Sequence, residues 1–155
     1  MKNYYSYNIN TNCVLIVEND GNIVEIALAD KKINGTKKET DIIKKAASQL
    51  KEYFAGKRKT FDFPINPQGS EFQKQVWSAL QNIPYGELRT YKQIAEEIGN
   101  AKAARAVGMA NNKNPLPVIV PCHRVIGSNG KLTGYAYGLK MKEYLINIEK
   151  NACLL

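Results

Sequence analysis

The residues with the clearest capacity for chemistry are a cysteine and a histidine that follow each other in the chain. Cys122 and His123 lie in the segment Pro-Cys-His-Arg-Val at 121–125, and His123 is the only histidine present. A thiol attacks as thiolate and titrates near about 8.5, so it needs a base at neutral pH. Neighbours on a strand point to opposite faces, so contact between the two requires a bend after Pro121 or a bridging water.

The stretch of chain around this pair carries basic side chains and no acidic ones. The 155 residues carry a net charge of +8, and no Asp or Glu occurs between Ile98 and Lys142. A basic surface attracts a polyanion, and this reading is favoured over a merely solvated basic face, so the stretch predicts contact with nucleic acid. Its basic residues are Lys102, Arg105, Lys113, Arg124, Lys131, Lys140 and Lys142.

Composition excludes several classes. With 44% hydrophobic and 23% charged residues the chain is typical of a globular protein, and no apolar run approaches the roughly 20 residues of a membrane span. The N-terminus lacks the apolar stretch of a signal peptide, and three cysteines (Cys13, Cys122, Cys153) without framework spacing predict free thiols. We therefore expect a cytoplasmic protein, nucleoid-associated in a prokaryote, with no membrane, no metal and no cofactor.

The pattern of elements predicts an α+β protein of two domains. Residues 1–65 form a small α/β domain: a hairpin over 13–28 with an Asp-Gly turn, a helix over 41–54 capped by Thr40, and a short strand over 60–63. Residues 66–155 form a second, mostly helical domain. Its last helix, about 140–150, is expected to bury its apolar residues, Met141, Tyr144, Leu145 and Ile148.

The second domain contains the outline of a helix-turn-helix. Capping boxes begin helices at Ser70 and Thr90, and a Gly-Asn turn at 99–100 separates the second of these from a helix over 102–110. That last helix is built of small residues around Arg105, followed by a loop over 111–117. A slim helix can approach a duplex closely while one cationic side chain enters the groove or the base stack. Packing against neighbours would suit the small residues but would not explain the arginine.

The second domain resembles one family over about 72–149. The motifs are Ile-Pro-Tyr-Gly at 83–86, Thr-Tyr at 90–91, Ala-Ala-Arg-Ala-Val-Gly at 103–108, Asn-Pro at 114–115, Pro-Cys-His-Arg-Val at 121–125, Gly-Tyr at 134–135, Gly-Leu at 138–139 and Glu149. Together they resemble the O6-alkylguanine-DNA alkyltransferases, for which Pro-Cys-His-Arg-Val is highly specific. The first 65 residues match only in general layout.

The resemblance implies DNA repair by direct transfer of an alkyl group to a cysteine. A monomer with a winged helix-turn-helix would bind double-stranded DNA, flip out O6-alkylguanine (or O4-alkylthymine) and pass the alkyl group to Cys122. The product is a thioether, which is neither a thiolate nor a good leaving group. Each molecule is therefore expected to act once.

The resemblance also implies roles for single residues. Glu149 would orient His123, which would deprotonate Cys122 through a water. Tyr91 would give a proton to the leaving guanine and contact the rotated phosphate, and Asn114 would brace the turn that carries the cysteine.

Further positions are implied for DNA and for the flipped base. Arg105 would fill the gap left by that base, and the other DNA contacts would be Tyr91, Lys102, Ala103, Ala104, Gly108 and Lys113. The pocket would be lined by Met109, Val125, Tyr135, Ala136 and Tyr137. Tyr137 stands where many relatives have glycine, so we expect bulky adducts to enter poorly. Ala136 stands where some relatives have serine.

Three other functions fit parts of the pattern. A protein that binds alkyl lesions without accepting the group would lack the cysteine, which is present here. A methylation-sensing regulator would use the helix-turn-helix to read promoters and would carry a further domain. A cysteine hydrolase would leave Arg105 and the acid-free stretch unexplained.

Overall fold

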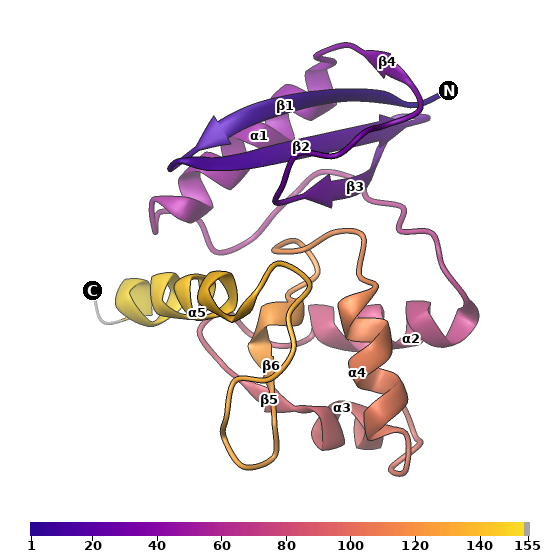
Figure 1. The fold of residues 1–155 in the computed structure, drawn as a ribbon, viewed down its shortest axis with the longest axis vertical. Coiled ribbons are helices and arrows are strands. Elements are labelled where there is room, and N and C mark those ends of the chain that lie inside the picture. Colours follow the sequence, from indigo (N-terminus) through magenta and orange to yellow (C-terminus); the bar gives the residue numbers. More distant parts are fainter. Residues whose placement is uncertain (154–155) are drawn as a thin grey trace. The chain divides into compact units, whose positions relative to one another are not determined.

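The computed structural model describes residues 1–153 and divides into two compact units, Met1–Gln68 and Gly69–Leu155 (Figure 1). The first unit is a four-stranded sheet of order β3-β2-β1-β4 with helix α1, Asp41–Phe54, packed against it. Its strands β1, β2 and β3 are antiparallel and β4 runs parallel to β1. Their bounds are Asn3–Ile9, Asn12–Asn19, Asn22–Ala27 and Thr36–Lys37.

Local sequence signals explain several of these elements. Asp20 and Gly21 both have positive φ, 51° and 78°, which gives the tight turn that joins β2 to β3. The Thr40 hydroxyl accepts from the backbone N–H of Ile43 at 3.4 Å, and Gly56 has φ of 74° just after α1 ends. The predicted hairpin, helix and cap in this unit are thus confirmed.

Two expectations for the first unit were wrong. Strand β1 was not predicted, although it pairs with β2 along its whole length. The segment 60–63 is not a strand, because its polar groups bond to a helix side chain instead of a neighbouring strand. Gln49 of α1 accepts from the backbone N–H of Asp62 at 3.2 Å, and its amide also donates to the Asp62 carboxylate.

The second unit is mostly helical, as predicted. Reciprocal capping boxes begin α2 and α3: Ser70 and Gln73 bond to each other's backbone N–H, and so do Thr90 and Gln93. Strands β5 and β6 form a short parallel pair that was not predicted. The elements are α2 Glu71–Gln81, β5 Arg89–Thr90, α3 Tyr91–Glu97, α4 Ala104–Asn112, the 3-10 helix η1 Cys122–Arg124, β6 Val125–Ile126 and α5 Leu139–Cys153.

Helix α4 is shifted from the predicted range of 102–110. It begins at Ala104, after a cap residue whose side chain makes no capping bond, and it continues to Asn112 in the segment expected to be a loop. Tertiary bonds hold this last turn: Trp77 Nε1 donates to the carbonyl of Ala110 at 2.9 Å, and Asn111 Nδ2 donates to the carbonyl of Cys122 at 3.2 Å. Helices α3 and α4 pack against each other and against α2 (Figure 1).

Helix α5 buries a different face from the one expected. Its buried side chains are Lys142, Leu145, Ile146 and Glu149, whereas Met141, Tyr144 and Ile148 are only half-buried. These four buried residues recur at helical spacing, but two of them, Lys142 and Glu149, have ionisable side chains. Among the described residues no helix has the length and apolar character to span a bilayer.

Truncating a core residue of α2 tests the packing of the second unit. Leu80 is fully buried, so Leu80→Ala is expected to lower the free energy of unfolding by about 2–5 kcal/mol. Trp77, the only tryptophan, lies on the same helix, so its fluorescence during urea unfolding reports on this unit. The exposed Lys74→Ala on α2 is the control and is expected to change stability by less than about 0.5 kcal/mol.

Candidate active site

Cys122 lies on a sharp turn and not on a strand. The turn follows Val118, a β-branched residue with φ of 76°, which is a strained backbone conformation. After Pro121 the chain forms the 3-10 helix η1, in which the N–H of Arg124 donates to the carbonyl of Pro121 at 3.0 Å. A bend after Pro121, one of the two possibilities that the sequence left open, is therefore present, and it places Cys122 and His123 on one turn of helix.

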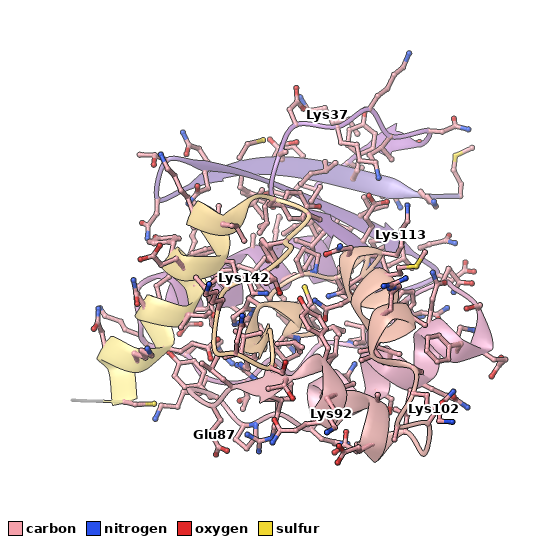
Figure 2. All side chains as sticks on the ribbon, turned by 60° about the horizontal axis from the view of Figure 1, so that its bottom comes forward. Lys37, Glu87, Lys92, Lys102, Lys113 and Lys142 are labelled. Carbon is pink, nitrogen blue, oxygen red and sulfur yellow. The ribbon has the colours of Figure 1, made fainter. Side chains whose placement is uncertain are left out.

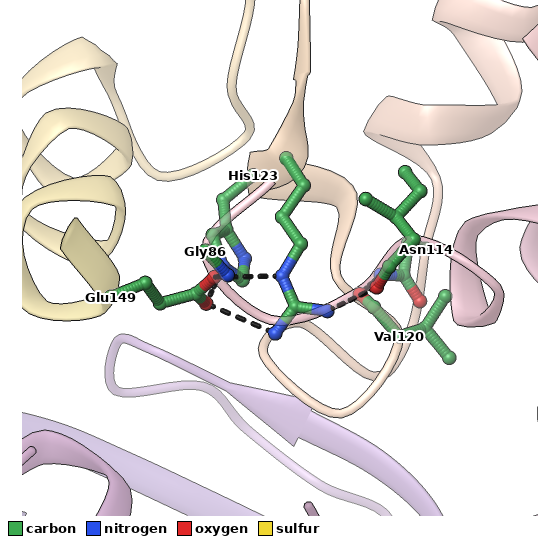
Figure 3. Close-up of polar contacts among 7 residues, drawn as sticks. Gly86, Asn114, Val120, His123 and Glu149 are labelled. Atoms are coloured by element: carbon green, nitrogen blue, oxygen red, sulfur yellow. Dashed lines mark hydrogen bonds and ion pairs between the residues drawn. The ribbon is translucent and has the colours of Figure 1, made fainter. Parts of the chain in front are cut away.

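Two asparagines hold this turn from the side of α4. Asn114 Nδ2 donates to the carbonyl of Val120 at 2.8 Å (Figure 3 labels both residues). Asn114 Oδ1 also accepts from the N–H of Leu116 at 2.9 Å. Asn111, to which the sequence analysis gave no role, donates to the carbonyl of Cys122 itself. The backbone on both sides of the thiol is thus fixed by side-chain amides.

Glu149 reaches the same turn from α5. Its carboxylate lies 2.5 Å from His123 Nε2, and it accepts from Arg124 Nε at 2.8 Å and from the N–H of Gly86 at 2.9 Å (Figure 3). Arg124 Nη1 donates further to the carbonyl of Ile83 at 2.7 Å. Arg124 was predicted as part of a motif and of the basic stretch facing nucleic acid, but it is buried and joins the carboxylate to the 83–86 turn.

The contact between Glu149 and His123 decides the protonation states of both side chains. Burial alone would raise the pKa of Glu149, but bonds and charges from His123 and Arg124 outweigh it and lower that pKa to about 2. Burial lowers the pKa of His123, and Glu149 offsets this only in part, so the resting imidazole is neutral. A carboxylate at Nε2 requires the proton there, which leaves the lone pair on Nδ1.

The thiol of Cys122 is also neutral at rest. Its side chain is 4% exposed, and burial raises the pKa of the thiol. Four groups act against this rise in the pKa: Asn114, the charge of Lys142, Tyr135 and the backbone of Cys122 itself. The thiol and the imidazole of this turn are therefore both neutral, and no standing ion pair joins them.

Tyr91 lies at the first position of α3 and faces the loop beyond η1. Its hydroxyl donates to the carbonyl of Thr133 at 3.0 Å, and burial raises its pKa, so the phenol keeps its proton. Lys142 donates to the same carbonyl at 2.8 Å and to that of Gly134 at 3.2 Å. Lys142 was predicted only as one of the basic residues of the acid-free stretch.

The residues expected to contact DNA lie on the surface of α3, α4 and the turn between them. Lys102, Arg105 and Lys113 are exposed, and Lys92 on α3 joins them as an exposed cation (Figure 2). Ala103 and Ala104 are half-buried at the start of α4. A Cβ added to Gly108 would lie 3.8 Å from the Tyr91 ring, so α4 passes close to that tyrosine.

The expected pocket residues differ widely in exposure. Val125 is buried, while Met109 is 66% exposed on α4 and Ala136 is exposed in the loop. The rings of Tyr135 and Tyr137 meet edge to face, with centroids 6.0 Å apart. Of these residues, Tyr135 acts on the pKa of the thiol, and burial raises its own pKa well above the ordinary value. Within residues 1–153 no three His, Cys, Asp or Glu side chains gather as metal ligands.

The second unit therefore combines a buried thiol, a buried imidazole–carboxylate pair on the same turn, and two packed helices with exposed cations, as expected of a protein that takes groups from DNA. Two family models match: the 6-O-methylguanine DNA methyltransferase DNA-binding domain over residues 71–151 and the ribonuclease-like domain of the same proteins over residues 4–67. The chain belongs to the 6-O-methylguanine DNA methyltransferase family.

Individual relatives agree with this assignment. The methylated-DNA–protein-cysteine methyltransferase of Methanosarcina acetivorans is 62% identical over 109 residues, which are 70% of each chain. The constitutive enzyme of that name from Bacillus subtilis is 54% identical over 118 residues, 76% of this chain and 72% of its own. A crystal structure of Mycobacterium tuberculosis OGT in complex with DNA superposes with a TM-score of 0.91 at 38% identity, covering 97% of this chain and 94% of that one.

Replacing Glu149 tests the ionised pair through its pH dependence. Its pKa of about 2 lies below the ordinary 4.5, so the carboxylate stabilises the folded state above pH 4.5 and loses this effect as the pH falls toward 2. The difference in unfolding free energy between wild type and Glu149→Gln is expected to shrink by about 3 kcal/mol over that window.

Urea unfolding followed by Trp77 fluorescence at pH 7, 5 and 3 measures this difference. The surface substitution Glu71→Gln on α2, where the carboxylate is exposed, serves as the control. A difference for Glu149→Gln that stays constant from pH 7 to pH 3 would contradict an ionised, buried Glu149.

Proposed function

We propose that this chain repairs double-stranded DNA by moving the alkyl group of O6-alkylguanine, or of O4-alkylthymine, onto the sulfur of Cys122. The observation that carries the proposal is the 2.5 Å contact of His123 with Glu149 on the helical turn that also holds Cys122. That contact orients a neutral base beside a neutral thiol, in a chain of the family described above. The other proposed roles follow from this one.

Attack begins with a proton leaving the thiol. His123 takes it on Nδ1 through a bridging water, and Glu149 stabilises the imidazolium that results. The thiolate of Cys122 then attacks the alkyl carbon, so that a sulfur–carbon bond forms as the bond from that carbon to O6 breaks. The electron pair of the broken bond remains on the guanine.

The leaving guanine needs a proton, and Tyr91 supplies it. Its phenol is kept protonated by burial and already donates to the Thr133 carbonyl, at the edge of the loop that carries Tyr135. A charge left on the purine would oppose departure, so proton donation lowers the barrier. In the bound state the same hydroxyl lies beside the rotated phosphate.

The pocket for the flipped base is formed by η1, β6 and the loop over 133–138. The carbonyls of Cys122 and Val125 recognise the exocyclic amine, and the backbone at Tyr135 and Ala136 faces O6. Tyr137 packs on Tyr135 and narrows the pocket, which favours small alkyl groups over bulky ones such as benzyl. Met109, exposed on α4, covers the base from the DNA side.

Helices α3 and α4 carry the proposed DNA surface. Arg105 projects from α4 and fills the gap left by the flipped base, which offsets part of the few kcal/mol that flipping costs. Exposed lysines flank it and neutralise phosphates without reading sequence. The contacts proposed besides Arg105 and Tyr91 are Lys102, Ala103, Ala104, Gly108 and Lys113.

The reaction ends with a thioether on Cys122. No group in the proposed site can remove the alkyl group again, so each molecule acts once and needs neither metal nor cofactor. One sulfur serves one lesion, so a monomer is sufficient. A substrate in DNA fits a cytoplasmic protein, which would associate with the nucleoid in a prokaryotic cell.

Removing the sulfur tests the acceptor. Wild type incubated with a duplex that holds one O6-methylguanine is expected to gain one methylene unit of mass, on the peptide that contains Cys122. Cys122→Ala is expected to gain none and still to bind the duplex in a mobility-shift assay. Cys153→Ala, which removes an exposed free thiol, is the control and is expected to accept the methyl group normally.

The same experiment separates the other functions. Tight binding by wild type without a gain of mass would indicate a lesion-binding protein, and repeated turnover of an ester or peptide would indicate a hydrolase. Methyl uptake by Cys122→Ala would refute the assignment of the acceptor.

Replacing Arg105 tests its proposed role in base flipping. Arg105→Ala is expected to slow repair of the methylated duplex by about tenfold or more, because the vacated stack is no longer filled. Its reaction with the free base O6-methylguanine is expected to be unchanged, because no flipping is required. Single-turnover rates measure both, and Arg58→Ala, which removes the same charge in the first unit, is the control. Equal losses on duplex and free base would argue against the role.

A further inference from the structure

Lys142 is a fully buried lysine on α5 that the mechanism above does not use. Taking an ammonium out of water costs several kcal/mol unless its protons are bonded. Here Nζ donates to the carbonyls of Thr133 and Gly134, at 2.8 Å and 3.2 Å. A long apolar side chain would fill the same space without that cost, so the charge itself needs an explanation.

The lysine joins three segments around the thiol. The Thr133 carbonyl accepts from Lys142 and also from the hydroxyl of Tyr91, and Nζ lies 5.8 Å from the centre of the Tyr91 ring. Helix α5, the start of α3 and the loop that leads to Tyr135 are thereby tied together (Figure 2 labels Lys142). This loop carries Tyr135, and the phenol of Tyr135 and the thiol of Cys122 act on each other's pKa.

The charge of Lys142 also acts on Cys122. It lowers the pKa of the thiol against the effect of burial, and the thiol in turn favours the charged lysine. Burial brings the pKa of Lys142 down to about 8, so the ammonium is still charged at neutral pH. The titratable and charged groups that act on this pair are Tyr91 from α3, His123 from η1 and Tyr135 from the loop.

We propose that Lys142 is a positioning residue for alkyl transfer, which fixes the 133–135 wall of the guanine pocket and favours the thiolate form of Cys122. This inference rests on the proposed function of Cys122. The two effects come from one ammonium group: its protons hold the loop carbonyls, and its charge attracts the developing thiolate. A lysine with only a structural role would do the first and not the second.

The charge effect predicts a shift in pH dependence when Lys142 is made neutral. Lys142→Met keeps the length of the side chain and removes the charge. We expect the pH profile of Cys122 reactivity to move upward by about one unit, so that the rate at pH 7 falls about tenfold. Lys142→Arg keeps a cation and is expected to restore the wild-type midpoint, even if its larger head slows transfer.

Two reactions measure the profile. The first is methyl transfer from the methylated duplex between pH 6 and 9. The second is alkylation by iodoacetamide, in which the sulfur of Cys122 displaces iodide and the thiol proton passes to His123. The mass of the peptide that contains Cys122 measures this reaction separately from alkylation of Cys13 and Cys153. Lys150→Met, which removes an exposed charge from the same helix, is the control and is expected to leave both profiles unchanged.

Trp77 fluorescence establishes that each variant is folded at the assay temperature, and Lys142→Gln provides a second neutral side chain. A raised midpoint in both neutral variants and its return in Lys142→Arg support the inference. Slower reactions with an unshifted midpoint, or no change at all, would overturn it. Failure of wild type to take up methyl from the duplex would instead overturn the proposed function, while the iodoacetamide profiles still decide the effect of Lys142 on the thiol.

Discussion

The carboxylate of Glu149 is the interaction on which the rest of the site depends. It is a buried anion that receives bonds from His123, Arg124 and the backbone of Gly86, and so joins α5 to η1 and to the 83–86 turn. A buried charge is stable only with such partners. The same contacts fix the tautomer of His123, so the bonds that stabilise the fold here also select the nitrogen that takes the proton in the proposed reaction.

Burial keeps the nucleophile inactive until a substrate is present. A thiol that stood ionised and exposed would react with any electrophile, and in the proposed reaction Cys122 can be used only once. The structure raises the pKa of the thiol by burial and surrounds it with groups that favour the thiolate: Asn114, Tyr135 and Lys142. Reactivity therefore depends on a substrate that fits against these groups.

Sequence predicted those parts of the structure that local rules determine. The capping boxes, the Asp-Gly turn and the bend at Pro121 depend on residues within a few positions of each other, and all are present. The buried face of α5 was not predicted correctly, because hydrophobic periodicity assigns charged residues to the solvent-facing side of a helix. Lys142 and Glu149 instead point inward, where they bind Thr133 and His123. Asn111 was missed for a similar reason: its partner, the Cys122 carbonyl, is defined only by tertiary structure.

Helix α4 links the proposed DNA contact to the chemistry. One face carries the exposed Arg105 and Met109, and the other packs inward through Val107 and ends at Asn111, which holds the Cys122 carbonyl. Asn111 follows Arg105 by six positions, which is about 9 Å along a helix axis. In the proposed reaction a base leaves the stack at one point and enters the pocket at another. A rigid helix keeps those two points at a constant separation, so the arginine that occupies the stack and the sulfur that receives the alkyl group act on the same nucleotide.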